Sequence, residues 1–325
     1  MNSPITGKSM RLMREPRIIP FRKEDFEVVF HYWLCEDSGE QFEDEMQAEL
    51  NINQVYNQYR AKHNIPMTDE IQKIRTMYGI PGSKMSEVLG FGANQYRQYE
   101  ASEIPSISNG RLIMQAADPE DFLKMVKSAS LDLGQPYADE LINTISEKIK
   151  LKSIDISIDY SERMSELTGY RRLSLQKLWN MVIFFSERIK PFKVKLNKLL
   201  FYSDFYHFKL YGCSISGTPY RAIQYGPVPA DYQLHLAQGV VSGVLDIKTI
   251  ELYDLNAERF LGKIEFQKEI FNKQEIDVLQ KIAERFETYS NNQIMEISHK
   301  ERAWIECEPN HSLIDYRFAF DLLAI

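Results

Sequence analysis

The chain has 325 residues, of which 44% are apolar and 26% are charged. These are ordinary values for folded globular proteins, so they exclude wholesale disorder, and the length allows two or three domains that each bury a core. The formal net charge of −7 disfavours nonspecific binding of nucleic acid by the whole chain, so any DNA contact must come from a local face.

The cysteines and the absence of long apolar runs indicate the compartment. Cys35, Cys213 and Cys307 are odd in number and far apart in the sequence, so a disulfide framework is not expected. No run approaches the about 18 apolar residues of a membrane span, and residues 1–16 lack the apolar core of a signal peptide. We expect a cytoplasmic protein with no membrane partner.

Residues 1–42 predict a small β-sheet. Two β-rich runs, Arg17–Phe21 and Phe26–Leu34, are bounded by a proline or by polar residues. We expect aromatic side chains to supply its packing: Phe21, Phe26, Phe30, Tyr32, Trp33 and Phe42.

A sheet followed by a helix and three further helices is similar to the N-terminal region of MqsA-type antitoxins. In that family two C-x-x-C pairs hold a zinc ion. The pairs fall here on Ser3 and Thr6, and on Cys35 and Ser38, so three of the four ligands are hydroxyl groups, which bind zinc poorly. We therefore predict no metal, and a subdomain that must pack against a neighbour or a second subunit.

Residues 43–67 predict a connecting helix that Pro66 ends, and residues 68–130 predict a helical domain. Thr68 is the expected N-cap of its first helix, Glu70–Tyr78. The second helix is expected at Ser83–Leu89 and the third at Ala93–Ala101, with Tyr96 and Tyr99 facing inward.

The third of these helices resembles the recognition helix of a helix-turn-helix of the MqsA or Cro type. Asn and Gln can pair with adenine and Arg with guanine in the major groove. The candidate DNA-binding residues are Lys84, Asn94, Gln95, Arg97 and Gln98. Between residues 68 and 130, however, seven Lys and Arg face eight Asp and Glu, and binding driven by phosphate contacts usually needs a basic surplus. A module that only dimerises is the alternative.

Residues 131–168 form the expected linker. Ile154, Ile156 and Ile158 alternate with polar residues, which fits either an edge strand or an ordered linker. We place the next domain boundary near Thr168.

Residues 169–325 predict a mostly helical domain around one central helix. Apolar residues cover a wide arc of Leu173–Arg188, as in a buried helix. The helix that begins near Lys195 carries aromatic residues around most of its circumference, so we expect it to be packed on two sides, and Gly212 ends it. A short strand, Tyr220–Tyr225, is expected to end at Gly226-Pro227.

This last region resembles the Panacea domain, also called the SocA-associated domain, of bacterial antitoxins. The matching segments are Lys195–Tyr202, Leu210–Gly212, Ala222–Val228 and the stretch from Ser298-His299 to Trp304. The resemblance implies a protein-binding domain that neutralises a toxin and has no chemistry of its own. Candidate toxin-binding anchors are Tyr202, Tyr206, Tyr220, Arg221 and Tyr225, for each of which ordinary core packing is the alternative.

Nothing in the sequence predicts catalysis, a cofactor or a metal. The six histidines are scattered, with no HExxH and no CxxC. Cys307 and His311 are four residues apart, but Pro309 breaks the helix that would align them. Asp204, in the central helix, is either a functional carboxylate or, as we expect, a hydrogen-bonded or exposed helix residue.

Together these features predict a mainly α protein of the α+β class, with a helix-turn-helix domain followed by a Panacea-like domain. The predicted function is that of an antitoxin in a type II toxin-antitoxin system. It would bind a protein toxin, and as a homodimer it would repress its own operon by binding operator DNA. The alternatives are a proteolytic adaptor for a toxin, a transcriptional regulator with a ligand-sensing C-terminal domain and, third, an enzyme.

Overall fold

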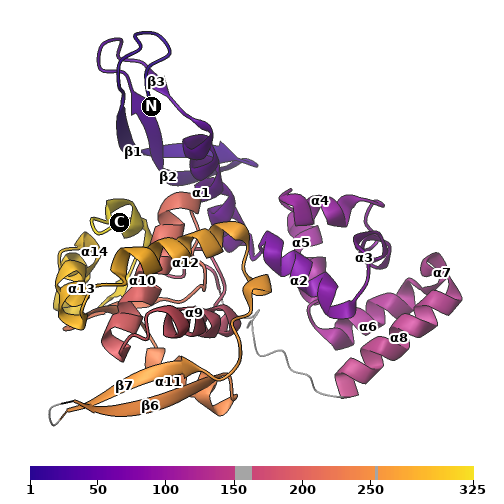
Figure 1. Ribbon diagram of the computed structural model, residues 1–325. Coiled ribbons are helices and arrows are strands. Elements are labelled where there is room, and N and C mark those ends of the chain that lie inside the picture. The colour runs from indigo at the N-terminus through magenta and orange to yellow at the C-terminus, as the bar shows by residue number, and fades with distance from the viewer. Residues whose placement is uncertain (151–162, 253–254) are drawn as a thin grey trace. The chain divides into compact units, whose positions relative to one another are not determined.

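The computed structural model describes residues 1–150, 163–252 and 255–325. It contains two compact units: one comprises Met1–Gln58 and Ser157–Ile325, and the other comprises Tyr59–Ile156. Helices predominate, and the strands of the described residues form three small antiparallel sheets (Figure 1). The predicted α+β class is confirmed. The alternating isoleucines between 154 and 158 lie outside the described residues.

The first sheet contains β1 (Arg11–Phe21), β2 (Glu24–Leu34) and β3 (Gln41–Phe42), in the order β1-β2-β3. Arg22 and Lys23 connect β1 to β2 with positive φ angles of 48° and 67°. A two-residue hairpin turn of type I′ needs positive φ at both positions because its twist then matches that of the strands. The predicted sheet is therefore present as a tight hairpin with a short third strand.

Helix α1 (Glu45–His63) lies along one edge of β2, and its side-chain amides hydrogen-bond the strand backbone there. The amide of Asn51 accepts a hydrogen bond from the His31 N–H at 2.8 Å and donates one to the His31 carbonyl at 2.8 Å. Gln54 makes the same pair of bonds with Val29, each at 2.9 Å. These amides satisfy the backbone groups of Val29 and His31, so the part of this β2 edge that lies beyond β3 does not need another strand.

The other edge of the sheet, along β1, lacks two of its donors. Val29 turns its N–H and C=O toward α1, and its partner across the ladder is Pro16. In an antiparallel ladder both residues of such a pair point their backbone groups outward. Pro16 and Pro20 therefore stand where the open edge would present N–H groups, which discourages pairing with another strand.

This N-terminal sheet packs against the C-terminal residues of the same unit. The guanidinium of Arg14 lies 3.2 Å from the carboxylate of Asp321. The rings of His31 and Phe320 meet edge to face at 4.7 Å between centroids. From α1, Asn57 donates a hydrogen bond to the Gly212 carbonyl at 2.9 Å. The predicted dependence of the sheet on a neighbour is thus met within the chain.

Among its described residues, the second unit contains helices joined by short connections and no strands. The helices that follow α1 are α2 (Thr68–Tyr78), α3 (Gly82–Leu89), α4 (Gln95–Ala101), α5 (Ile107–Gln115), α6 (Pro119–Ser128), α7 (Ser130–Leu133) and α8 (Gln135–Lys150). The expected N-cap is wrong by one residue: Met67 precedes the helix, and Thr68 lies in its first turn. The Glu70 carboxylate accepts from the Met67 N–H at 2.8 Å, so it caps the helix instead.

Two inward-facing tyrosines hold α2, α3 and α4 together, as predicted. Tyr96 is fully buried, its hydroxyl donates to the Ile71 carbonyl at 2.8 Å and its N–H donates to Ser86 Oγ at 3.1 Å. Tyr99 is also buried and accepts from Asn109 Nδ2 at 2.8 Å. The opposite face of α4 is left to solvent.

The C-terminal region of the first unit alternates helices with short strands. Its elements are α9 (Leu175–Arg188), α10 (Lys193–Tyr211), β4 (Tyr220–Ile223), β5 (Gly226–Pro229), α11 (Tyr232–Val241), β6 (Leu245–Leu252), β7 (Leu255–Gly262), α12 (Lys273–Phe286), α13 (Asn291–Ser298), α14 (Arg302–Cys307) and β8 (Leu313–Ile314). Short 3-10 turns lie at Lys268–Ile270, Glu308–Asn310 and Tyr316–Asp321. One small sheet has the order β5-β4-β8, and the other pairs β6 with β7.

Helix α10 is the central helix that the sequence predicted. It contacts α9, α12, α13, β5 and the 3-10 turn Tyr316–Asp321 (Figure 1). Buried residues cover its whole circumference from Lys195 to Phe208, apart from Tyr206. A helix buried on all sides must be apolar or have its polar groups paired. No described helix has the combination of length and apolar character needed to span a bilayer.

The predicted end of the strand after α10 is wrong. β4 ends at Ile223, and Gly226 and Pro227 begin β5, so the two strands form a hairpin. Neither Gln224 nor Tyr225 has a positive φ, and the positive value falls on Gly226 at 92°. This is the pattern of a type I turn followed by a glycine. The proline remains in the strand because β5 is an edge strand.

Candidate functional site

The turn between β4 and β5 is held by side chains from three other elements. Lys198, in the middle of α10, is fully buried and its Nζ donates to the Pro227 carbonyl at 3.0 Å. Trp304, in α14, donates from Nε1 to the Ile223 carbonyl at 2.8 Å. The two bonds lie on either side of Tyr225.

His299, at the end of α13, supports Trp304. Its ring stacks on Trp304 at 4.0 Å between centroids, with an interplanar angle of 13°. Burial, together with the nearby Lys198 charge, lowers the pKa of His299, so the ring is kept neutral.

Gly226 is required for this close packing. With φ of 92°, a Cβ at this position would lie 2.6 Å from Lys198 Cε and 2.5 Å from Ser298 Oγ. Such distances are shorter than real Cβ contacts, and the backbone conformation is one that other residues rarely adopt. The glycine therefore lets the turn lie directly on Lys198.

Lys198 occupies an unusual environment for a charged group. Burial lowers its pKa to about 7, and no carboxylate contributes to that shift. Among the described residues its one hydrogen-bond partner is the Pro227 carbonyl. Burying a cation with a single bond costs stability, so this amine does not have the environment of an ordinary ion pair.

Asp204 lies one and a half turns further along α10 and is a hydrogen-bonded residue, as expected. Its carboxylate accepts from the N–H groups of Ile215 and Ser216, each at 2.8 Å. It also accepts from Ser216 Oγ at 2.6 Å and from the Tyr220 hydroxyl at 2.8 Å. Burial raises the pKa of Asp204, and these bonds act in the opposite direction. The carboxylate fixes the segment that leads into β4.

The five candidate anchors for a toxin differ in their exposure. Tyr202 and Tyr220 have no accessible surface. Tyr202 donates to the Glu301 carboxylate at 3.1 Å, and Tyr220 donates to Asp204. Neither can touch a partner in this conformation because both are part of the core.

The other three candidates are accessible. Tyr206 and Arg221 are half-buried, and Arg221 donates to the His311 carbonyl at 2.7 Å. Tyr225 is 57% exposed.

Four of the five candidate DNA-binding residues lie on α4 or at its N-terminus, and Lys84 lies in α3. Asn94, Arg97 and Gln98 are exposed. The other two are half-buried and engaged: Lys84 pairs with Glu87 at 2.6 Å, and Gln95 donates to the Glu103 carboxylate at 3.3 Å. The face available to a ligand therefore consists of the first three.

Ser3, Thr6, Cys35 and Ser38, the four positions that the resemblance to MqsA-type antitoxins would place at a zinc site, come together in the structure. Thr6 Oγ1 lies 3.4 Å from Cys35 Sγ. Hydrogen bonds from Ser3, Ser38 and Thr6 lower the pKa of the Cys35 thiol to about 6. We call these four residues the hydroxyl knuckle. Within residues 1–150, 163–252 and 255–325, no three His, Cys, Asp or Glu side chains are grouped as metal ligands.

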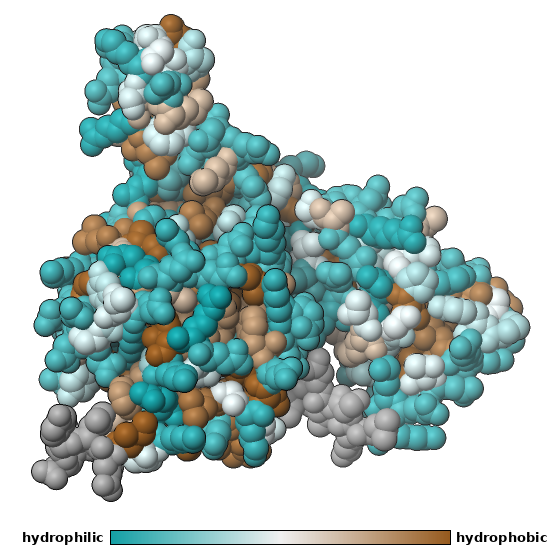
Figure 2. Space-filling view, viewed as in Figure 1, coloured by the Kyte–Doolittle hydropathy of each residue, from teal (hydrophilic) through white to brown (hydrophobic). Residues whose placement is uncertain are grey.

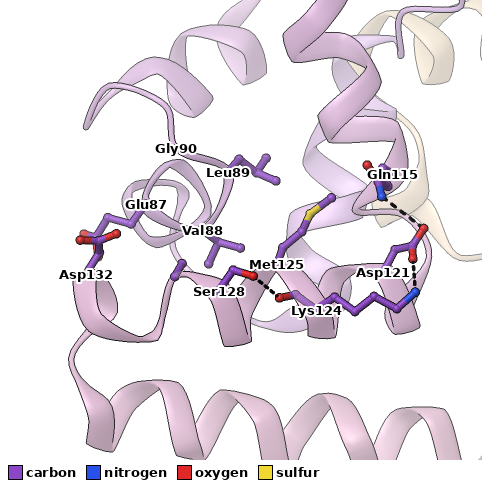
Figure 3. A pocket seen from close by; sticks show the side chains of 11 residues that line it. Glu87, Val88, Leu89, Gly90, Gln115, Asp121, Lys124, Met125, Ser128 and Asp132 are labelled. Atoms are coloured by element: carbon purple, nitrogen blue, oxygen red, sulfur yellow. Dashed lines mark hydrogen bonds and ion pairs between the residues drawn. The ribbon is translucent and has the colours of Figure 1, made fainter.

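A cavity of about 410 Å³ lies in the second unit, between α3, α6 and α7 (Figure 3). Val88, Leu89 and Met125 supply apolar walls, and Asp121 pairs with Lys124 at 2.7 Å on its rim. Figure 2 shows apolar side chains between polar ones on the visible surface of this unit. A deep apolar cavity in the C-terminal region would have favoured ligand sensing, but this one is open, partly polar and outside that region.

The residues that clamp the turn were quoted in the sequence motifs but were not assigned a role there. Lys198, His299 and Trp304 are separated by up to about a hundred positions, so only their tertiary arrangement reveals a common purpose. The signal that the sequence offered for these residues was the stretch from Ser298-His299 to Trp304, which is one of the segments that resemble the Panacea domain.

Comparison with known proteins gives one match. Neither the curated proteins nor the solved structures include a match to this chain. The family model described as "Antitoxin SocA-like, Panacea domain" matches residues 196–305. This range includes Lys198, the turn, His299 and Trp304, so the clamped turn lies inside a region similar to an antitoxin domain.

Proposed function

We propose that this chain is an antitoxin that neutralises a protein toxin by direct binding through its C-terminal region. The observation that carries the proposal is the match of residues 196–305 to the SocA-like Panacea antitoxin domain. The buried arrangement of that region supports it, since three of its four motif segments meet at one turn.

Binding accounts for the polar residues of this region better than chemistry does. Asp204 and Lys198 have the perturbed pKa values that active sites often show. Asp204, however, is satisfied by four donors, and Lys198 holds a backbone carbonyl. Both act on the protein's own backbone. Neutralisation by capture needs only a complementary surface with a few well-placed anchors.

The test is co-expression of the full chain with the protein encoded by the adjacent gene. The full chain is needed because the N-terminal sheet packs against the C-terminal residues. We expect growth to be rescued and a stoichiometric complex to be purified. Neutralisation at well below one equivalent would contradict capture, and a toxin that disappears only when an unfoldase is present would favour a proteolytic adaptor.

We further propose that the chain represses its own operon through α2, α3 and α4. Asn94, Arg97 and Gln98 are exposed on α4, and these side chains can read base edges in the major groove. Among the described residues, Arg97 has no ion-pair partner to compete with DNA. A homodimer would place two such helices on the two halves of an operator.

Fluorescence anisotropy with DNA from the region upstream of the gene tests this second proposal. Arg97→Ala should weaken binding about 5- to 150-fold and relax the sequence preference, because a base contact contributes about 1–3 kcal/mol. Lys127→Ala removes an exposed positive charge from α6 and is the matched control. Equal losses in both variants, or no binding by the unmodified chain, would argue against readout by α4.

A further inference from the structure

The turn between β4 and β5 presents an aromatic side chain to solvent. Tyr225 is 57% exposed, whereas Tyr202, Tyr220 and Tyr316 of the same unit are fully buried. One exposed aromatic residue is common on protein surfaces and carries no conclusion by itself. The support beneath Tyr225 provides a second and independent observation.

The turn has more support than a hairpin needs. The β4–β5 ladder already pairs Ile223 with Gly226. Beyond that pairing, the backbone of the turn is held by Trp304 at Ile223 and by Lys198 at Pro227, and His299 stacks on Trp304. These side chains come from α14, α13 and α10, so the position of the turn is fixed relative to the core.

One of these supports, Lys198, lowers the stability of the folded chain. Replacing a buried charged group by an apolar one of similar volume is often neutral or stabilising. Lys198 is fully buried and donates to one carbonyl. Stability alone would therefore favour a methionine at this position. The lysine is explained if the location of the Pro227 carbonyl, and of the turn with it, matters for something other than stability.

We propose that the turn 223–227 is the element that contacts the protein partner, with Tyr225 as its anchor and Lys198 as a positioning residue. This inference rests on the proposed antitoxin function and names the surface that function would use. The partner is a protein with an apolar recess that accepts the tyrosine ring and a hydrogen-bond acceptor or donor for its hydroxyl. A preorganised aromatic side chain loses little conformational entropy on binding, which is why tyrosine is frequent at the centres of interfaces.

The experiment measures the affinity of the full chain for the product of the adjacent gene by titration calorimetry. Tyr225→Ala should weaken binding about 30-fold or more, the effect of truncating a hot-spot residue. Leu234→Ala is the matched control, because Leu234 is 58% exposed on α11 of the same unit. It should change the affinity less than about 3-fold.

A double-mutant cycle tests the role of Lys198. If Lys198→Met acts by releasing the turn, it should weaken binding about 10-fold in the unmodified chain and have no further effect in Tyr225→Ala. A purely structural role would give additive losses. Thermal unfolding of each variant identifies a general loss of folding. If Lys198→Met does not fold, protection of the 224–226 amides from hydrogen exchange on complex formation replaces it, and unchanged exchange counts against the proposal.

The outcomes separate this inference from the proposed function. If the unmodified chain binds and neutralises the toxin but Tyr225→Ala and Leu234→Ala have equal effects, the partner uses another surface and only the present inference fails. If the unmodified chain does not bind the adjacent gene product, the antitoxin proposal fails as well.

Discussion

The hydroxyl knuckle and the clamped turn both fix a backbone turn with polar side chains, but they obtain these side chains differently. The knuckle uses Ser3, Thr6 and Ser38 around Cys35, so each half is local in the sequence. The turn 223–227 is held by α10, α13 and α14, whose contributing residues are far apart. The first can be recognised from spacing, and the second only from the folded chain.

The two regions also differ in what stabilises them. Hydrogen bonds among hydroxyls contribute little net stability, on the order of 1 kcal/mol each. The N-terminal sheet therefore relies on contacts such as Arg14 with Asp321 and His31 with Phe320. The clamped turn lies on a core, where an unpaired polar group costs the most free energy. Removing one hydrogen-bond partner should therefore lower the free energy of unfolding more at the clamped turn than in the N-terminal sheet.

The largest effect is expected from Asp204→Ala. The substitution leaves four donors without their acceptor: the N–H groups of Ile215 and Ser216, Ser216 Oγ and the Tyr220 hydroxyl. We expect the free energy of unfolding in urea to fall by about 3–5 kcal/mol, as for other broken buried networks. Asp121→Ala, which breaks the surface pair with Lys124, is the control and should cost less than about 1 kcal/mol. Similar losses would remove the contrast between buried and surface polar groups.

A smaller effect of opposite sign, a stabilisation, is expected when the three hydroxyl residues of the hydroxyl knuckle are replaced by cysteine. The triple variant Ser3→Cys, Thr6→Cys and Ser38→Cys adds three thiolates to Cys35, the four ligands that a tetrahedral zinc site needs. We expect one zinc ion per chain and a stabilisation of about 3–4 kcal/mol at free zinc 100 to 1,000 times the dissociation constant. Thermal unfolding with and without a chelator measures it.

The matched control carries Cys35→Ser in addition, which leaves three thiolates. It should bind zinc more weakly. If the triple variant takes up no zinc, the four positions do not form the tetrahedral arrangement that their proximity indicates.

The smallest effect concerns the pH dependence that Lys198 contributes. Its folded pKa of about 7 lies below the ordinary value of 10.5. Below pH 7 the amine is protonated in both states, so the cost of the buried charge is fully present. Between pH 7 and 10.5 the unfolded chain binds more protons than the folded chain, so stability rises with pH. The neutral His299 ring, whose pKa is also lowered, does not titrate in this range.

Lys198→Met should lack this contribution. The free energy of unfolding of the unmodified chain, relative to that of Lys198→Met, should therefore rise with pH by up to about 1.4 kcal/mol per pH unit. Denaturation at pH 7, 8 and 9 measures the slope. A constant difference would show that the amine keeps its proton throughout the range, and that its environment is less restrictive than its burial indicates.

Much of the fold could be predicted because its signals are local. Apolar residues at spacings of three and four indicated α9 and α10, and tyrosines spaced by three indicated the inner face of α4. A glycine ended α10, as expected, since Gly212 has φ of 72°. The sequence was wrong about β5, because Gly226-Pro227 is usually a stop and here begins an edge strand.

The candidate site was predictable only in part. Residue type, within the region that resembles the Panacea domain, grouped Tyr202, Tyr206, Tyr220, Arg221 and Tyr225 as equal candidates. Their exposure differs from zero to more than half, because burial depends on which elements cover each side chain. The sequence likewise marked Lys198 as part of a motif but gave no reason to expect a lysine in the core.

By itself, the sequence determined the helical class, the central helix, the four knuckle positions and the resemblance to an antitoxin domain. These follow from short-range periodicity, residue chemistry and spacing. Only the tertiary structure decided that Lys198, His299 and Trp304 meet at one turn and that Tyr225 is left outside. The physical reason is that hydrogen bonds between residues 29 and 81 positions apart depend on the packing of whole helices, which no local pattern encodes.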